Sequence, residues 1–363
     1  MIANALPRPL TAGSVDNAIL RADGTDGTIL QNSSIVIDDA TTTTQANVAI
    51  TNQHAGQTNS ALVLTPKGTG ALILGPKPDG TTTGGNARGA NAVDLQTSRT
   101  SSTQVASGAR SAILSGSRNT ASGNDGVVCG GVNNTALTNG FVGAGSGNTG
   151  AVMSVVCGGE GNTTGTGNSA SFIGAGTGNS ATGQGSVVCG GGRNDVGGVA
   201  GNTASAVMGS VLGGSSAQAD RYAMQAHAAG RFAAQGDAQR ARFVMRNKTT
   251  TNAAVELFLD GSSARLTIPS GRVLGLTINI TGISSTGAAV AHYMRQYALK
   301  NVSGTTSEVY APITIGTDNA AGTSIALSAS DASDALIVSV TGTASTIWRW
   351  VASVDAVEIA YGI

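Results

Sequence analysis

A short phrase recurs six times along the middle of the chain and constrains its fold more than any other feature. Each copy has a pair of apolar residues, then three small residues, then an Asn six positions after the second apolar residue. The copies run over 113–119, 128–134, 142–148, 156–162, 173–179 and 188–194, with a degenerate copy near 211–212. Successive copies begin 14 to 17 residues apart, which is too short for a unit with its own core. Stacked strand-and-turn units of this size predict a β-solenoid.

The phrase alternates between two sequence variants, and a large side chain beside a small one in one variant replaces two medium side chains in the other. Val-Val-Cys-Gly-Gly begins at 127, 155 and 187, and Phe-Val/Ile-Gly-Ala-Gly begins at 141 and 172. In a strand, the first and third positions face one way and the second and fourth the other. Val with Cys therefore alternates with Phe and Gly on one face, while Val or Ile occupies the other. Both faces are expected to be covered, one by the chain's own coil and the other by another subunit. A homotrimer is favoured, although the repeat does not set the number of copies.

Composition limits the other fold and function classes. With 53 Gly in 363 residues and only 3% aromatic residues, the chain lacks the large side chains for one big globular core. Twenty basic and twenty acidic residues cancel, so we expect neither nucleic acid nor an acidic membrane surface as a partner. The first residues resemble no charged leader, and no apolar run approaches about 18 residues, so we expect neither secretion nor membrane insertion.

Three Cys, at 129, 157 and 189, occupy the same slot of the repeat. Their odd number and shared slot predict free, reduced and buried thiols in a chain assembled in the cytoplasm, rather than disulfides.

Changes in composition and in the pattern of apolar residues divide the chain into five segments, for which we predict an all-β fold. They are an N-terminal segment (1–45), a β-rich neck (46–104), the β-solenoid repeats (105–219), a connector (220–238) and a C-terminal antiparallel β-sandwich or jelly roll (239–363). In the last segment about ten short period-two strands, two of them at 347–354 and 356–361, are separated by turn signals. Trp348 and Trp350 share a face of a late strand and are expected in its core or at a subunit contact.

The repeats and two other stretches resemble known fibrous proteins. Residues 185–194 (GSVVCGGGRN) are similar to the repeats in the head of trimeric autotransporter adhesins, a parallel β-roll. The stretches 61–110 and 231–259 resemble fibre and tail appendage proteins of tailed bacteriophages. This resemblance implies an N-terminal segment that docks onto other virion proteins and a distal C-terminal tip. The adhesin stalk and membrane barrel have no counterpart here, which favours the phage interpretation.

No catalytic, cofactor-binding or metal-binding residue is predicted. A glycan hydrolase needs two carboxylates about 5 to 9.5 Å apart, and the nearest pairs in sequence, Asp38 with Asp39 and Asp331 with Asp334, are more typical of turns. His54, His227 and His292 have no neighbours at metal-ligand spacing. The Asn of each repeat is expected either to form an amide ladder or to occupy a turn, with ion or glycan binding as a lesser alternative. Loops at 260–263, 303–306 and 318–322 are candidate contact loops of the tip.

The predicted function is a non-enzymatic, homotrimeric structural fibre of a phage virion, assembled in the host cytoplasm, whose tip attaches to a host-surface glycan or protein. A capsid-bound head fibre or decoration protein is the alternative. A glycan depolymerase and a bacterial surface adhesin are the remaining hypotheses.

Overall fold

The computed structural model describes residues 64, 66–167, 170–192 and 201–361, together with the backbone of three strands nearer the N-terminus. It divides into two units, 1–67 and 68–363. In the first unit, β1 (Ala18–Asp23), β2 (Ile29–Asp38) and β3 (Ala49–Asn52) form an antiparallel sheet in that order. The predicted strand at 61–64 lies almost wholly outside the described residues. Strands make up the second unit, and no helix occurs among the residues described, so the all-β prediction is confirmed.

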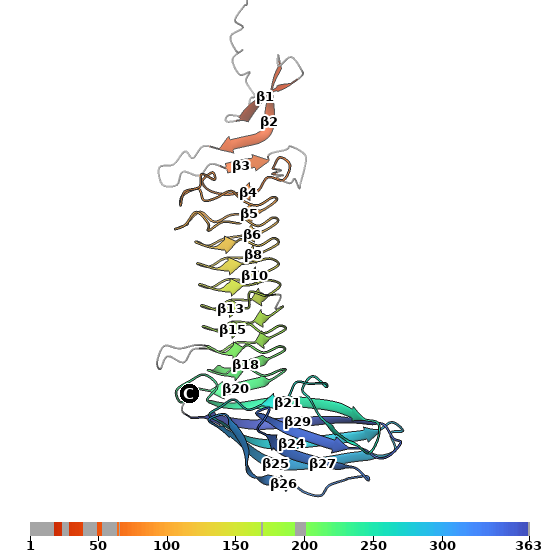
Figure 1. The fold of residues 1–363 in the computed structure, drawn as a ribbon. Coiled ribbons are helices and arrows are strands. Elements are labelled where there is room, and N and C mark those ends of the chain that lie inside the picture. Colours follow the sequence, from red (N-terminus) through yellow and green to blue (C-terminus); the bar gives the residue numbers. More distant parts are fainter. Residues whose placement is uncertain are drawn as a thin grey trace, which may run out of the picture. The chain divides into compact units, whose positions relative to one another are not determined.

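The second unit begins as a β-solenoid, as the repeat predicts (Figure 1). Its first parallel ladder consists of β4 (Leu72–Ile73), β5 (Val93–Asp94), β6 (Ala112–Ile113), β8 (Val127–Val128), β10 (Phe141–Val142), β12 (Val155–Val156), β14 (Phe172–Ile173), β16 (Val187–Val188), β18 (Ser210–Ser215) and β20 (Gln225–Ala229). The second consists of β7 (Thr120–Ala121), β9 (Thr135–Ala136), β11 (Thr149–Gly150), β13 (Thr163–Thr164), β15 (Ser180–Ala181), β17 (Thr203–Ala204) and β19 (Gln218–Ala219). The first ladder extends beyond 105–219 at both ends.

The interior of most coils is narrow and lined by apolar side chains, whereas in β5 the inward residue is Asp94, whose carboxylate pairs with Arg88 at 2.8 Å and with Arg99 at 3.2 Å. The second residue of each apolar pair, such as Val128, Val142 or Ile173, has no exposed surface. It shares a hydrophobic cluster with the second residue of the other ladder, such as Ala136 or Ala181. A branched side chain against a methyl group fits the short distance across a 14-residue coil, and each buried Val or Ile contributes about 1.5–3 kcal/mol.

Glycine is required where each coil turns after the first ladder. Gly145 has φ +100, and a Cβ on it would lie 2.0 Å from the carbonyl oxygen of Gly159 in the next coil. The same contact recurs at Gly131 and Gly159. Both the left-handed backbone and the stacking distance exclude a side chain here, which explains the small residues of the phrase.

The Asn of the repeat forms a buried ladder rather than a turn. In Asn148, Oδ1 accepts the main-chain N–H of Asn162 at 3.0 Å, and Nδ2 donates to carbonyl oxygens of its own coil (Ala144, 3.0 Å) and of the next (Gly159, 2.8 Å). The same three bonds recur at Asn119, Asn134, Asn162 and Asn179. Each amide therefore ties one coil to the next.

The ladder continues at a position that the repeat phrase did not predict. Asn194 lies outside the described residues, and Asn202 takes the next rung, with its N–H donated to Asn179 Oδ1 at 2.9 Å. The signal that locates it is the following residue: ladder Asn precede Thr or Ser, as Asn202 does, whereas Asp195 follows Asn194. At the other end the ladder begins with Gln96, whose Oε1 accepts the N–H of Asn119 at 2.9 Å.

The parallel ladder passes directly into the C-terminal sheets. β20 pairs antiparallel with β21 (Ala238–Thr249), so one fifteen-stranded sheet continues through β29 (Trp348–Ala360), β24 (Arg272–Ser284), β25 (Val290–Val302) and β26 (Thr305–Thr314). A smaller antiparallel sheet contains β22 (Ala254–Glu256), β23 (Leu266–Thr267), β27 (Ser324–Ser330) and β28 (Ala335–Thr341). The predicted strands 347–354 and 356–361 are one strand, β29, because Asp355 points outward and pairs with Arg240 and Arg242.

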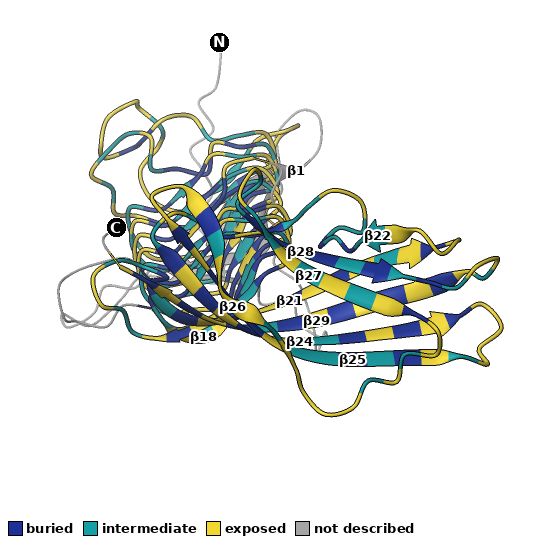
Figure 2. Cartoon of the chain, turned by 60° about the horizontal axis from the view of Figure 1, so that its bottom comes forward, coloured by how far each residue is buried: buried dark blue, intermediate teal, exposed yellow. Residues whose placement is uncertain are grey.

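Side chains of both C-terminal sheets share one hydrophobic cluster. Buried and exposed residues alternate along β21, β24 and β29 (Figure 2), and the buried ones, such as Leu274 and Ile278, belong to the same cluster as Leu336 and Val338 of β28. Trp348 and Trp350 lie in this core, stacked with ring centroids 5.4 Å apart. Their indole N–H groups donate to Thr343 and Thr249.

Candidate functional site

An open groove lies where the last coil meets the C-terminal sheet. It holds about 390 Å³ and is lined by β20, β21, β29 and the segment between the first two, including His227, Phe232, Arg240, Val357 and Ile359. Phe232 and Val357 are 75% and 68% exposed. An apolar concave surface with a few polar groups is the usual form of a binding site. His227 was predicted to be an isolated histidine, and the structure places it on the wall of this groove.

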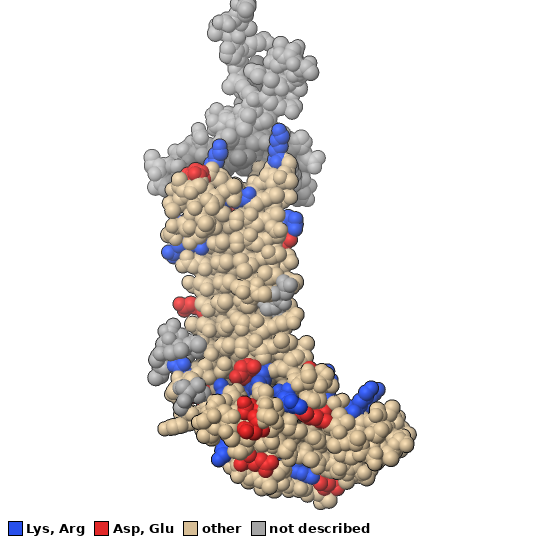
Figure 3. All heavy atoms as spheres, viewed as in Figure 1, with Lys and Arg blue, Asp and Glu red and all other residues tan. Residues whose placement is uncertain are grey.

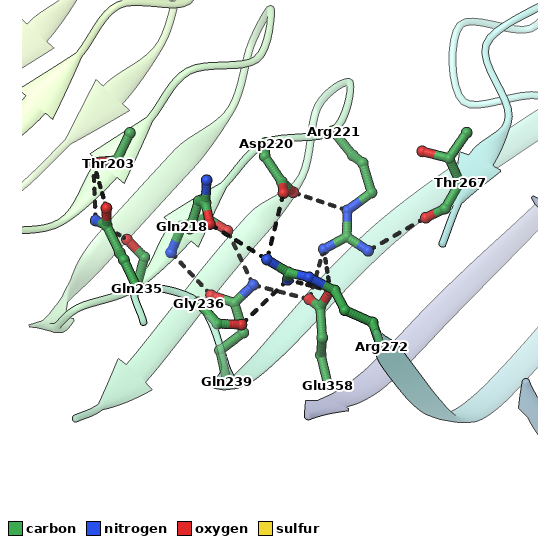
Figure 4. Close-up of polar contacts among 11 residues, drawn as sticks. Thr203, Gln218, Asp220, Arg221, Gln235, Gly236, Gln239, Thr267, Arg272 and Glu358 are labelled. Atoms are coloured by element: carbon green, nitrogen blue, oxygen red, sulfur yellow. Dashed lines mark hydrogen bonds and ion pairs between the residues drawn. The ribbon is translucent and has the colours of Figure 1, made fainter. Parts of the chain in front are cut away.

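A buried ionic network lies beside the groove and joins the coils to the C-terminal sheets (Figure 4). Glu358 of β29 is bound at 2.6 Å by Arg221, from the turn after β19, and at 2.6 Å by Arg272 of β24. Gln239 of β21 donates to the same carboxylate at 2.9 Å. Asp220 pairs with Arg221 at 3.0 Å. Charged groups rarely lie this deep in a protein without such partners.

The electrostatics of Glu358 suit a structural role better than proton transfer. Burial by itself raises the pKa of this carboxyl, but Arg221, Arg272 and Gln239 together hold the pKa below its ordinary value. A general acid in glycoside hydrolysis needs the opposite, a raised pKa. The network therefore fixes the last coil against the sheets, and sequence reasoning missed it because Glu358 lies 137 positions from Arg221 and 86 from Arg272.

The other carboxylates considered from sequence accept hydrogen bonds from a neighbouring hairpin where they are described. Asp331 accepts the N–H of Thr306 at 2.7 Å, and Asp334 accepts the side chains of Asn301 and Thr306 at 2.9 and 2.8 Å. The pair lies in the turn between β27 and β28 and ties it to the hairpin of β25 and β26. Asp39 and the side chain of Asp38 lie outside the described residues, as does His54. His292 Nδ1 lies 3.2 Å from the hydroxyl of Thr281.

Polar contacts hold two of the candidate contact loops in place. Asp260 accepts the main-chain N–H groups of Ser262, Ser263 and Ala264 at 2.8, 2.8 and 2.9 Å. These bonds, that of Ser263 first, hold the pKa of the Asp260 carboxyl well below its usual range. Asp318 pairs with Arg295 at 2.7 Å. Such loops are preformed, which keeps the entropic cost of binding low.

Two outward faces of the coils differ sharply in chemistry. The second ladder presents Thr120, Thr135, Thr149, Thr163, Ser180 and Thr203. The first ladder presents what we call the apolar face: Leu72, Val93, Ala112, Val127, Phe141, Val155, Phe172 and Val187 in register, and, two positions on, Leu74, Leu95, Leu114, Cys129, Cys157, Cys189 and Leu212. The charged groups visible in Figure 3 gather mainly over the C-terminal sheets rather than the shaft.

This arrangement decides which face of the phrase is the outer one, and it corrects one prediction. The first and third positions, with the Val/Cys and Phe/Gly alternation, point outward: Phe141 and Phe172 are 36% and 37% exposed. The cysteines are free, as predicted, but Cys157 and Cys189 are exposed and Cys129 is half-buried. The prediction of buried thiols was therefore wrong.

Among the residues described, no group of three or more His, Cys, Asp or Glu side chains could hold a metal ion. The part of the chain that the structure covers also has no helix long and apolar enough to span a membrane.

Neither protein-family models nor curated proteins match this sequence. Solved structures with some similarity are tailspike proteins of Acinetobacter phages. Gp49 of Acinetobacter baumannii bacteriophage Fri1, described as a capsular polysaccharide depolymerase, is 12% identical over 74% of this chain and 44% of its own, with a TM-score of 0.24. The tailspike of Acinetobacter phage vB_ApiP_P1 is 12% identical over 76% and 55%, with a TM-score of 0.22. That of Acinetobacter baumannii phage AM24 is 8% identical over 80% and 57%, with a TM-score of 0.20.

The chain spans about half the length of these tailspikes. One prediction is corrected by the comparison: we expected a protein without enzymatic activity, whereas the Fri1 protein is described as a depolymerase. A non-enzymatic role is accordingly no longer assigned to this chain.

Proposed function

We propose that this protein is a fibre or tail appendage of a tailed-phage virion that holds its C-terminal sheets against the host surface. The observation that carries this proposal is the single sheet that runs from β4 to β26. Because coils and C-terminal sheets share ladder hydrogen bonds and the Glu358 network, the shaft holds the end unit rigidly instead of through a flexible linker. A rod with a fixed end unit suits display at a distance.

The working assembly is a homotrimer with a C-terminal β-sandwich at each tip. The apolar face supports self-association, since a broad uncharged surface of this kind is rarely left in water. When one of three tips on a fibre has bound, the other two are held at a high effective concentration near the same surface. Modest affinity of each tip for a surface glycan or protein therefore becomes durable attachment. The N-terminal segment would bind other virion proteins, and the repeats would correspond to the β-roll of trimeric adhesin heads.

The proposal is tested with the purified full-length chain. Light scattering and unboiled SDS-PAGE should give a trimer, and the trimer should bind a subset of an array of bacterial capsular polysaccharides and lipopolysaccharides. The same incubations are read for release of reducing ends, which decides whether binding is accompanied by depolymerisation. A monomer that binds no surface glycan and no intact bacterial cell would overturn the proposal.

Position on the particle is a separate question with its own measurement. Gold-labelled antibodies against the C-terminal sheets should mark the tail of intact virions. Label on the capsid would instead assign the chain to a head fibre or decoration protein.

A further inference from the structure

The apolar face carries no charged side chain from β4 to β16. The charged residues of these coils lie mainly in the turns, where Arg110 of one coil pairs with Asp125 of the next at 2.7 Å. On the second ladder the corresponding outward residues are Thr and Ser, which water solvates readily. The interior is already filled by the second residue of each pair. The outward Val, Phe and Leu side chains stay half-buried or exposed in the single chain, and a partner surface would bury what is left.

We propose that the apolar face is where identical copies of this chain meet, parallel and in register, so that Cys129, Cys157 and Cys189 each lie beside their own counterparts. This inference rests on the proposed homotrimer and names the surface and register of its shaft. Residues that lie close to a rotation axis meet their own copies, so a charged residue there would meet a like charge. A face that lies along the axis is therefore expected to lack charges, as the apolar face does. A face for a different protein has no such restriction.

The alternation of side chains supports the register. Phe141 and Phe172, each followed two positions on by Gly, alternate along the shaft with coils that present Val and Cys. When the copies are in register, the Phe rings of different copies meet at coils where the neighbouring Gly leaves room for them. The coils that present Val and Cys then contact the same coils of the other copies. A slip of one coil, about 4.8 Å, would set Phe against Val and Cys and leave voids beside the glycines, which close packing disfavours.

Thiol cross-linking of the full-length protein tests the inference. A short bismaleimide alkylates two thiols that lie close together. Cross-linked peptides that join Cys157 to Cys157 form only between chains, and mass spectrometry identifies them. We expect such homotypic links at all three cysteines in the native protein, with covalent trimers on a denaturing gel. A variant that keeps only Cys157 (C129A, C189A) should stop at dimers, because one reagent joins two of three thiols.

The matched control places a thiol on the polar face of the neighbouring ladder. In a cysteine-free chain, Thr163→Cys puts an exposed thiol on β13, which follows β12 in the chain, and we expect no cross-linked species. If light scattering shows a trimer but Cys157 does not link while Thr163→Cys does, the inference fails and the homotrimer stands. Prevalent links from Cys129 to Cys157 between chains would overturn the register. A monomer in solution would overturn both proposals.

Discussion

Removal of one ladder amide should weaken the whole shaft, and Asn148 in the middle of the coils is the sharpest place to test this. The change Asn148→Ala leaves the buried main-chain N–H of Asn162 without the Oδ1 that accepts it at 3.0 Å. An orphaned buried donor costs about 1–3 kcal/mol. The two bonds from Nδ2, to Ala144 and Gly159, add about 0.5–1.5 kcal/mol each.

Neither of these carbonyl oxygens is left wholly without a partner. The carbonyl of Gly159 still accepts the N–H of Ser146 at 3.0 Å, and Ala144 is exposed to water. The free energy of unfolding should therefore fall by about 2–6 kcal/mol per chain. Asn148→Asp keeps the shape but points an oxygen at two carbonyl oxygens, so it should be at least as destabilised at neutral pH.

Guanidinium unfolding followed by circular dichroism measures the loss, and hydrogen exchange locates it. The N–H of Asn162 should exchange faster in Asn148→Ala, whereas amides of the C-terminal sheets keep their protection. Thr163→Ala is the control, because its exposed side chain faces water and its loss should change stability by no more than about 0.5 kcal/mol. The reasoning would be refuted by an Asn148→Ala protein as stable as this control, with the Asn162 amide still protected.

Three further outcomes are expected. Gly145→Ala should prevent regular stacking, because the new Cβ would lie 2.0 Å from a carbonyl oxygen of the next coil; loss of soluble, protease-resistant protein is the measurement, and a normally folded variant contradicts it. Glu358→Gln should cost about 3–5 kcal/mol at pH 7, since Arg221 and Arg272 lose the carboxylate that binds both of them, and Asp220 alone is left beside two buried arginines. The native carboxyl has a lowered pKa, so its contribution is present above its unfolded pKa of about 4.5 and is lost as pH falls through the folded value; melting temperatures from pH 7 to 3 should decline less in Glu358→Gln, and parallel curves would count against this role. Val155→Asp should dissociate the trimer in light scattering, whereas Thr163→Asp on the polar face should not; equal behaviour of the two variants would contradict the interface.

The local pattern determined the coil. Period-two pairs with a fixed Asn, and glycines where the chain turns after the first ladder, specify a 14- to 17-residue unit that can only stack, and the structure has that stack. The C-terminal strands followed from the same alternation, as did the burial of Trp348 and Trp350. The coils, the strands and the burial of the two Trp residues follow from residues that are close together in the sequence, so they can be predicted from the sequence alone.

The sequence did not distinguish the inner face from the outer. Val127 and Val128 are equally apolar, and only the closure of the coil turns Val128 into the core and Val127 outward with Cys129. The repeat phrase also missed the rung after Asn179, because residues 193–200 interrupt the spacing; the Thr after Asn202 marks it, and the N–H of Asn202 donates to Asn179 Oδ1 at 2.9 Å.

The contacts that join the coils to the C-terminal sheets could be seen only in the tertiary structure. Glu358 meets Arg221 across 137 positions and Arg272 across 86, and no local signal connects residues so far apart. Repetition along the chain determined the shaft, because each coil repeats the contacts of its neighbour. The join between shaft and sheets occurs once, so three-dimensional folding alone decided which charges meet there.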